Sequence, residues 1–326
     1  MRSPDHDIFD RALLVRRRDR FARAAAAHDF LLAHVADDLA DRLSLIRRTF
    51  PLGLNLGAQH GLLSRRLRGK AQIGLMIDAE MSPQLLAQCD GPRLLADEER
   101  LPFAPTSLDL VVSGLSLHLV NDLPGALIQI RRALKPDGLF LAALLGGATL
   151  TELRQALVQA EAEIEGGASP RVAPFADVRD LGGLLQRAGF ALPVADSDVV
   201  QVGYASALHL MRELRAMAAA NVLRDRRRRF LRRTTLLRAA AIYAERFARP
   251  DGRVTATFEI ITLTGWAPHA SQQKPLQPGS AATRLADALG VPERPAGDQA
   301  GSSRTAEDPR PPPASGGVAP AAPSRK

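Results

Sequence analysis

The chain has 326 residues, a net charge of +8 and 46% hydrophobic residues, enough for one large α/β domain with additions or two smaller domains. Its single cysteine, Cys89, excludes an internal disulfide and a cysteine-based metal site, and is typical of a reducing compartment. Aromatic residues make up only 4% of the chain, and no nucleic-acid-binding module is recognisable, which argues against a nucleic-acid partner. No apolar run is long enough for a transmembrane segment.

The N-terminal part of the chain is predicted to lead into the main domain. Residues 1–20 are charged and without an apolar core, so we expect a mobile arm or a short helix rather than a signal or transit peptide. An amphipathic helix is predicted from residue 30, with Leu31, Val35, Leu39 and Leu43 at helical spacing. Pro51 ends that pattern.

The next segment predicts three short strands. Residues 52–56 form the first, and the turn at 57–61 leads into a helix carrying Leu62, Leu63 and Leu67. Residues 73–77 form the second, followed by Ser82 and Pro83, a typical helix start. Residues 93–96 form the third and end in three acids at 97–99.

The segment 108–145 indicates the fold class. Residues 108–113 and 139–145 are apolar runs typical of buried strands. Between them we predict a helix with Pro124 near its start and Ile128, Ala133 and Leu134 on its inner face, then a turn at 135–138 with Gly138 in its left-handed position. A strand, a helix and a strand in about forty residues predict a right-handed parallel crossover, and therefore an α/β protein.

The second half predicts further helices and two more strands. The helices are expected at 149–163, 177–188 (ended by Gly189), 205–219 and over the arginine cluster 224–233; the strands are expected at 199–202 and 258–264. We expect a flexible loop at 166–174, one short helix at 281–289, and disorder after residue 290. The predicted domains are an N-terminal arm and helix at 1–48, the main domain at 49–268 with helical additions at 205–248, and a Pro/Gly/Ser-rich tail at 269–326.

The first of these strands ends in the glycine-containing turn, and polar side chains stand where the next three end; an open parallel sheet binds ligands at these strand ends. Asp78 and Glu80 follow the second strand, Asp97 follows the third, and His118 follows the fourth. An acid at the end of the second strand is the usual ligand of a ribose, and the turn at 57–61 lacks the full dinucleotide pattern, so a nucleoside ligand is favoured. His118 could orient a substrate, act as a base, or only close the pocket, whereas Asn121 and Asp122 are expected to cap the next helix.

The sequence resembles the class I S-adenosylmethionine-dependent methyltransferases. The likeness is carried by LLADEERLPF at 94–103 (with Leu101 and Pro102), by LDLVVSGLSLHLVNDL at 108–123 and by KPDG at 135–138. Within that family it resembles the branch of a mitochondrial complex I assembly factor that hydroxylates an arginine of the quinone-site iron–sulfur subunit. That likeness begins at IFDR (8–11) and continues through GGASP (166–170) to GWAPH (265–269) and Gly279-Ser280.

The resemblance implies a seven-stranded, Rossmann-like methyltransferase fold, mostly parallel with an antiparallel last strand, and S-adenosylmethionine as cofactor. It implies that the turn flanks the methionine part, that an acid binds the ribose, that two acids lie beside the adenine, and that residues 113–117 line the reacting end. The candidate cofactor residues are Asn55, Gly57, Gln59, Gly61, Glu80, Asp97, Glu98 and Ser113, with His118 as the candidate catalytic residue. Asn55 and Gln59 depart from the family pattern, which has aspartate and glycine there.

Three functions follow as hypotheses. The first is S-adenosylmethionine-dependent methyl transfer to an unidentified acceptor, for which the protein mainly aligns acceptor and methyl group. The second, implied by the branch, is hydroxylation of an arginine in a client subunit of respiratory complex I. The third is a non-catalytic binding protein that has lost the cofactor. We also expect no metal site. The protein is expected to be cytoplasmic and could be peripheral to the inner membrane. The arginine cluster at 224–233 is expected to be either a solvated helix face or a surface for an acidic partner or an anionic membrane.

Overall fold

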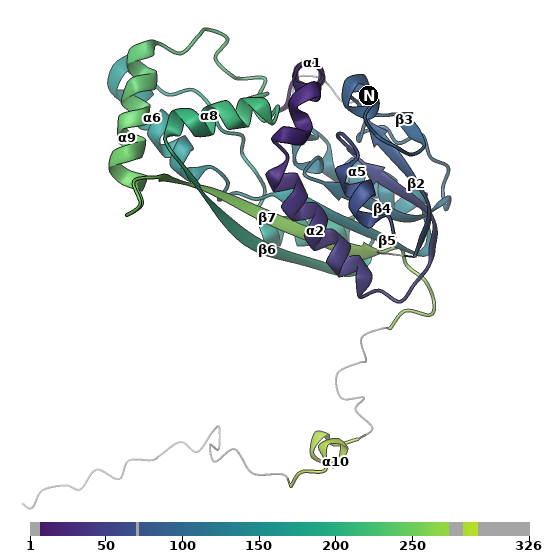
Figure 1. Cartoon of the computed structure of the whole chain (residues 1–326). Helices are drawn as coiled ribbons and strands as arrows, with labels where there is room; N and C mark the ends of the chain where they lie inside the picture. Colours follow the sequence, from purple (N-terminus) through teal and green to yellow (C-terminus); the bar gives the residue numbers. More distant parts are fainter. Residues whose placement is uncertain (1–6, 70–71, 274–282, 293–326) are drawn as a thin grey trace, which may run out of the picture. The chain divides into compact units, whose positions relative to one another are not determined.

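A computed structural model describes residues 7–69, 72–273 and 283–292. Contacts divide the chain into two units, residues 1–272 and 273–326. The first unit contains a sheet with helices on both of its faces (Figure 1). Its helices are α1 (Arg11–Phe21), α2 (Phe30–Ser44), α3 (Leu62–Leu67), α4 (Pro83–Leu86), α5 (Leu123–Ala133), α6 (Thr151–Glu165), α7 (Val178–Arg187), α8 (Ala207–Ala216) and α9 (Arg233–Phe247), with 3-10 turns η2 (Ala22–Ala27) and η3 (Leu117–Leu119).

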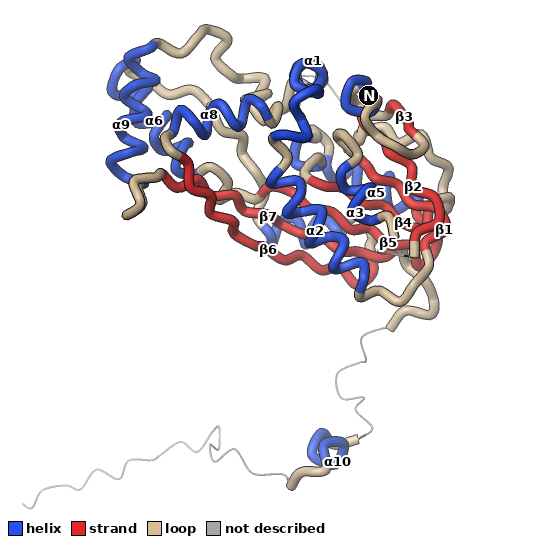
Figure 2. The backbone as a smooth tube through the Cα atoms, viewed as in Figure 1, coloured by secondary structure: helices blue, strands red, loops and turns tan. Residues whose placement is uncertain are grey.

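The sheet has seven strands in the order β3-β2-β1-β4-β5-β7-β6 (Figure 2). They are β1 (Phe50–Leu56), β2 (Ile73–Glu80), β3 (Arg93–Leu95), β4 (Leu108–Gly114), β5 (Leu134–Leu145), β6 (Ala191–Tyr204) and β7 (Val254–Trp266). The first five are parallel, and β7 runs antiparallel to both of its neighbours, β5 and β6. This confirms the predicted mostly parallel, seven-stranded methyltransferase fold, in which the ends of β1, β2, β3 and β4 meet at one edge.

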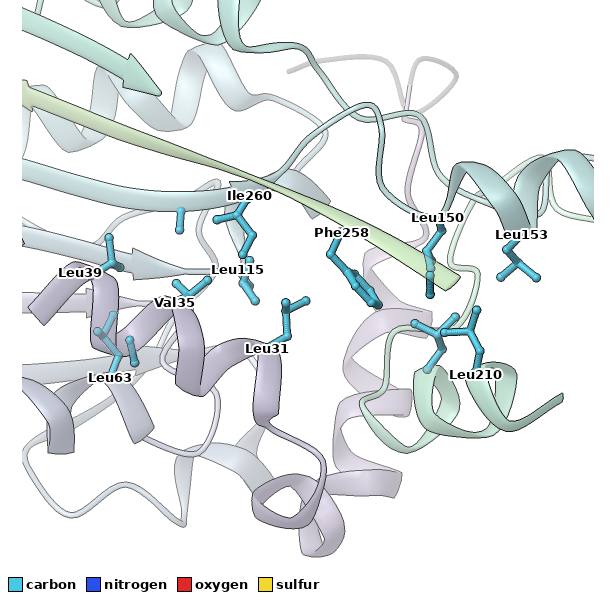
Figure 3. Packing of buried hydrophobic residues seen from close by; sticks show 14 of the residues in the cluster. Leu31, Val35, Leu39, Leu63, Leu115, Leu150, Leu153, Leu210, Phe258 and Ile260 are labelled. Carbon is cyan, nitrogen blue, oxygen red and sulfur yellow. The ribbon is translucent and has the colours of Figure 1, made fainter. Parts of the chain in front are cut away.

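Side chains along the central strands alternate between two hydrophobic cores, as the pleat of a sheet requires. On one face Leu110 and Val112 of β4 join α2, α3, α6, α8 and α9, and on the other Val111 joins α5 and α7. Figure 3 shows the first core, where Leu31, Val35 and Leu39 of α2 project toward the strands. The helix predicted from residue 30 therefore covers one face of the sheet, and its four leucine and valine positions are all buried.

Local sequence signals fix several element ends as predicted. Ser82 caps α4 by accepting a hydrogen bond from the Leu85 N–H at 3.2 Å, with proline at the first helical position. Asp122 caps α5 through the Gly125 N–H at 3.0 Å. Gly189 follows α7 in the left-handed conformation, at φ +82°.

Four local predictions were wrong. Residues 135–138 belong to β5, and the left-handed residue is Asp137 (φ +64°) rather than Gly138. Gly138 is needed instead because a Cβ there would lie 2.9 Å from the Lys135 carbonyl oxygen. Ile128 is 47% exposed, because the buried stripe of α5 runs through its neighbours. Pro51 lies inside β1, near its start, where a missing N–H is tolerated.

The arginine cluster 224–233 is the fourth correction, because α9 begins only at Arg233. Two of its arginines instead reach carboxylates of different elements: Arg226 lies 3.1 Å from Asp10, and Arg227 pairs with Glu165. These ties to different elements hold the segment as a loop. The strand predicted at 199–202 extends over all of β6, because β7 pairs with it from end to end.

Of the second unit, the structure describes α10 (Leu285–Leu289), which agrees with the C-terminal part of the helix predicted at 281–289. Most of the predicted tail at 269–326 lies outside the described residues, so that prediction and the domain boundaries stay predictions.

A pair of leucine substitutions tests the packing of α2. Leu39 is fully buried and Leu45 at the end of the same helix is 82% exposed. We expect Leu39→Ala to lower the free energy of unfolding by about 2–5 kcal/mol, because it leaves a cavity, and Leu45→Ala to change it little. Urea unfolding of both variants measures this. Equal losses would show that α2 does not cover the core as described.

Candidate functional site

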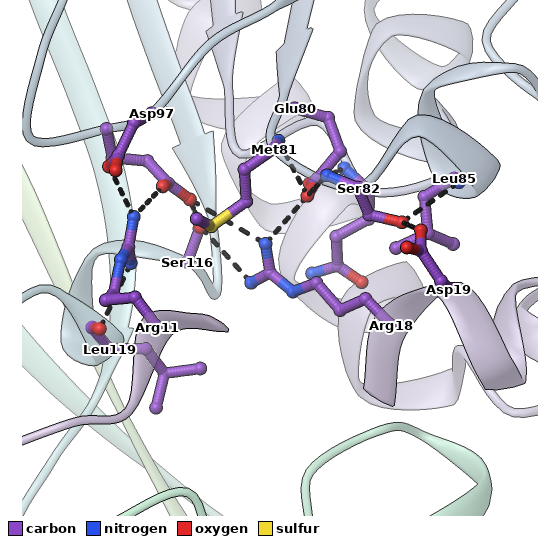
Figure 4. Close-up of polar contacts among 12 residues, drawn as sticks. Arg11, Arg18, Asp19, Glu80, Met81, Ser82, Leu85, Asp97, Ser116 and Leu119 are labelled. Atoms are coloured by element: carbon purple, nitrogen blue, oxygen red, sulfur yellow. Dashed lines mark hydrogen bonds and ion pairs between the residues drawn. The ribbon is translucent and has the colours of Figure 1, made fainter. Parts of the chain in front are cut away.

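The acids predicted at the strand ends meet two arginines from helix α1 (Figure 4). Arg11 and Arg18 are seven residues apart, which places them on one face of the helix, two turns from each other. They reach Glu80 at the end of β2 and Asp97 and Glu98 just after β3. The N-terminal segment thus covers the edge of the sheet where a ligand was expected.

Glu80 is completely buried, and four groups of this chain donate hydrogen bonds to its carboxylate. Arg18 Nη1 donates to Oε1 at 2.8 Å, as do the backbone N–H groups of Met81 and Ser82 at 3.0 Å each. The Gln59 N–H donates to Oε2 at 2.9 Å. Arg18 is itself only 5% exposed, as expected of an arginine whose charge is paired.

Glu98 forms the second half of this acidic pair. Arg11 bridges Glu98 and Asp97, the latter at 2.7 Å, and the Ser116 hydroxyl donates to Glu98. Burial alone would raise the pKa of Glu98, but Arg11, Arg18 and the Ser116 hydroxyl together lower it below its ordinary value. Glu98 is therefore an anion in the protein interior, held by fixed donors.

The glycine turn after β1 passes through three left-handed residues. Gly57 and Gly61 adopt φ +68° and +82°, and Gln59 between them is also left-handed at φ +51°. A Cβ at Gly57 would collide with the Ser116 hydroxyl. The Gln59 side-chain amide donates to the Gly114 carbonyl oxygen at 3.3 Å, so it spans the gap between the ends of β1 and β4.

Two predicted residues lie away from this cluster. Asn55 is buried in β1, where its amide donates to Asp78 Oδ1 at 2.9 Å and to Ser64 Oγ at 3.0 Å. Burial raises the pKa of Asp78, although Ser64 and Asn55 oppose the shift. Ser113 is buried in β4, and its hydroxyl has no hydrogen-bond partner among the described residues.

These residues do not offer a cofactor an open site in this arrangement. The ribose acid Glu80 is engaged by four donors of the chain, Ser116 fills the space over Gly57, and the Gln59 amide crosses the turn where the methionine part was expected. Two adjoining cavities lie beside α1. Of the eight predicted cofactor residues, only Gln59 lines one of these two cavities. Cofactor binding by these residues stays a prediction.

His118 lies in η3 and lines two adjoining cavities, of about 100 and 330 Å³. The larger one is mostly apolar and lies between α1, α6 and the loop after α8. Burial and the charge of Arg18 lower the pKa of His118 to about 3, opposed only by Glu98, and its Nδ1 has no partner among the described residues. His118 is thus neutral at pH 7 and too weak a base to take a proton from a guanidinium, which favours the orienting role.

Neither Arg11 nor Arg18 was predicted as a site residue, whereas Ser116 lies in the segment 113–117 that the resemblance places at the reacting end. The signal for the two arginines was their spacing of seven on a charged helix, but the segment gave no hint of what it packs against. Asn121, expected only as a cap, anchors the same segment, since its Oδ1 accepts from the Phe9 N–H at 2.7 Å.

No candidate metal site, a group of three or more His, Cys, Asp or Glu, occurs among the described residues. A search of the same residues finds no helix that is long and apolar enough to span a membrane.

His118 gives the site a pH signature. Because its folded pKa of about 3 lies below the value of about 6.5 in an unfolded chain, the unfolded state takes up a proton first as the pH falls. Stability contributed by the neutral ring is therefore complete above pH 6.5 and is lost progressively toward pH 3.

Urea unfolding at pH 7 and pH 5 measures this effect. The free energy of unfolding should fall less between these pH values for His118→Asn than for wild type. His209→Asn, on the exposed face of α8, is the control and should behave as wild type; equal pH dependence of all three would contradict a buried neutral His118.

Comparisons with known proteins agree with this architecture. A family model described as "Methyltransferase domain" matches residues 54–142. "Arginine-hydroxylase NDUFAF5, mitochondrial" from Danio rerio is 42% identical over 86% of this chain and 89% of its own length, and the Homo sapiens protein of that name is 44% identical over 84% and 81%.

More distant relatives and a solved structure complete the comparison. A "Malonyl-[acyl-carrier protein] O-methyltransferase" of Laribacter hongkongensis is 34% identical over 80% of this chain and 92% of its own. A putative methyltransferase structure from Bacillus halodurans has a TM-score of 0.51 at 12% identity, covering 72% of this chain and 99% of its own, and so shares the fold. The chain belongs to the class I S-adenosylmethionine-dependent methyltransferase family, in the branch that contains the mitochondrial arginine hydroxylases.

Proposed function

We propose that this protein hydroxylates an arginine side chain of a client subunit of respiratory complex I. The support from its relatives is broad, since proteins named arginine hydroxylases match more than four-fifths of the chain at 42–44% identity. The malonyl-carrier methyltransferases match at only 34%. The higher sequence identity to the arginine hydroxylases therefore favours hydroxylation over methyl transfer.

One structural observation carries the proposal: the ligand-binding edge of the sheet is built to hold guanidinium groups. Two buried glutamates there each accept an arginine of α1. The donor and acceptor pattern suits a cation with several N–H groups, which a carboxylate binds strongly when water is excluded.

The chemistry consists of inserting one oxygen atom into a bond to hydrogen on the arginine side chain, a two-electron oxidation. The oxidant is a co-substrate, either dioxygen with a two-electron donor or a peroxide. This reaction consumes no methyl group, so its balance does not require the transfer for which the fold is named. The protein residues orient the arginine and exclude water from it.

His118 and the apolar cavity fit that task. The neutral His118 ring lines both cavities and faces the Phe175 ring edge-on, with 5.4 Å between ring centroids. It can exchange a hydrogen bond with a bound group without adding charge beside Arg18. The cavity of about 330 Å³ is lined mainly by leucine, methionine, alanine and phenylalanine, which suits the aliphatic part of a long side chain.

Methyl transfer with S-adenosylmethionine remains the second candidate, because the family typically binds that cofactor and the malonyl-carrier methyltransferases are relatives. The third hypothesis, a binding protein without cofactor, predicts no calorimetric heat and no thermal shift with millimolar S-adenosylmethionine. The localisation also stays a prediction: the relatives are named mitochondrial, and the sequence suggested a cytoplasmic protein with peripheral contact to the inner membrane.

Mass spectrometry of complex I from a deletion strain tests the proposal. We expect one arginine of the quinone-site subunit to gain the mass of one oxygen atom in cells with this protein, and to lack it in the deletion strain. Re-expression of the wild-type chain should restore it, and so should Glu163→Gln, a change of a carboxylate on the exposed side of α6. An arginine of unchanged mass in both strains would remove the hydroxylase function, and a gain of one methylene group would replace it by methyl transfer.

A further inference from the structure

Arginine side chains from two elements lie where the larger cavity meets solvent. Arg215 near the end of α8 and Ala219 in the loop 217–232 that follows it are both exposed, and both line the cavity of about 330 Å³. Asn221 of the same loop lines it too, and its carbonyl oxygen accepts a hydrogen bond from Arg17 Nη1 of α1 at 2.6 Å. Figure 1 shows α8 running toward α1. The mouth of the cavity therefore lies beside guanidinium groups of both helices.

These guanidinium groups repel one another. Arg20 follows Arg17 by three residues and so lies on the same face of α1. Burial lowers the pKa of Arg17, and three neighbouring guanidiniums lower it further, those of Arg226, Arg20 and Arg215. The charge of Asp10 opposes this shift. A group of like charges that raises its own electrostatic energy in this way attracts anions.

The acids near this group are engaged by other side chains. Asp10 lies 3.1 Å from Arg226, and Glu213 of α8 lies 3.0 Å from the ring of His28. Among the residues that the structure describes, no carboxylate forms an ion pair with Arg20 or Arg215, and both are exposed. The protein thus presents two positive charges at the mouth of the cavity that its own acids leave unpaired.

The proposed function identifies the anion that these charges would meet. A client arginine whose aliphatic stem lies in the apolar cavity keeps its own backbone at the mouth. In an extended chain, the residues one and two positions away lie within about 7 Å of it. An aspartate or glutamate at one of these positions can therefore reach Arg20 or Arg215.

We infer that Arg17, Arg20 and Arg215 form a docking surface for acidic residues that flank the client arginine. The inference rests on the proposed function for the identity of the partner. It adds a preference for the client's neighbouring sequence, which oxygen insertion itself does not require. Because exposed ion pairs each contribute little to affinity, the surface mainly selects among arginines and speeds the encounter with the correct one.

Calorimetry with three capped pentapeptides tests the docking surface on the wild-type protein. The peptides are Asp-Ala-Arg-Ala-Asp, Asn-Ala-Arg-Ala-Asn and Lys-Ala-Arg-Ala-Lys. At about 50 mM NaCl we expect the aspartate peptide to bind about threefold to tenfold more tightly than the asparagine peptide, and the lysine peptide to bind most weakly. The difference should fall below about twofold in about 1 M NaCl, where the Debye length is about 3 Å.

Reversal of the charges gives a readout that a merely structural role would not produce. Arg20→Glu combined with Arg215→Glu should bind the lysine peptide most tightly and the aspartate peptide most weakly. Both side chains are exposed, so we expect the melting temperature to change little. The milder pair, Arg20→Gln with Arg215→Gln, should bind the aspartate and asparagine peptides equally.

Arg132→Glu combined with Arg246→Glu is the matched control. It changes the net charge by the same amount at two exposed arginines, one on α5 and one on α9. Arg246 contacts the side chains of Gln155 and Gln159, at 3.2 Å each, so no ion pair is lost there. The control should keep the wild-type order of the three peptides.

Three results would overturn the docking surface. They are no preference of the wild type for the aspartate peptide, an order that charge reversal leaves unchanged, and the same reversal in the control, which would show an effect of net charge alone. Vesicles of phosphatidylglycerol that bind the wild type but not the Arg20→Glu, Arg215→Glu variant, without any preference among the peptides, would assign these arginines to a lipid headgroup instead.

Failure of the docking surface is distinct from failure of the proposed function. A client arginine that is hydroxylated in cells, while the peptides show no preference, would refute the docking surface alone. A client arginine without added oxygen in cells that contain this protein would refute the proposed function, whatever the peptides bind.

Discussion

The contact between Arg18 and Glu80 determines how the ligand-binding edge of this fold is arranged. A carboxylate at the end of the second strand is completely buried, and a helix from the start of the chain neutralises it. Removing one partner of such a pair costs about 3–5 kcal/mol, because the other charge stays buried. The position of α1, the closure of the glycine turn and the exclusion of water from Glu98 all depend on this pair and on its companion at Arg11.

The fold was predictable because its signals are local. Ser82, Asp122 and Gly189 mark element ends through their own backbone chemistry, and the apolar runs of β4 and β5 are buried on both faces. The long strand β6 was not predictable in the same way. It is polar and half-exposed along most of its length, and it exists because β7 supplies its hydrogen bonds. Pairing with a distant partner leaves no trace in a strand's own periodicity.

Only the acids of the candidate site were predictable from the sequence, because the signals for their arginine partners are not local. Glu80 and Glu98 follow their strands directly, so the sequence places them at the correct edge of the sheet. Their partners are 62 and 87 residues away along the chain. Nothing in a charged N-terminal segment distinguishes an arginine that enters the interior from one that stays in water. Only the packing of α1 reveals the difference, because it places two guanidinium groups of this chain beside the acids that were predicted to bind a nucleoside.

The bonds between the segment around α1 and the loop 217–232 have a consequence for biosynthesis. Arg17 and the Asn221 carbonyl are 204 residues apart, and Asp10 is bonded to Val222 over a similar separation. A ribosome releases α1 long before it has made the loop that anchors it, and domains generally fold as units. Throughout that interval the helix lacks its bonds to this loop, and only its contacts with earlier residues such as Glu80, Asp97 and Asn121 are available to hold it at the edge of the sheet.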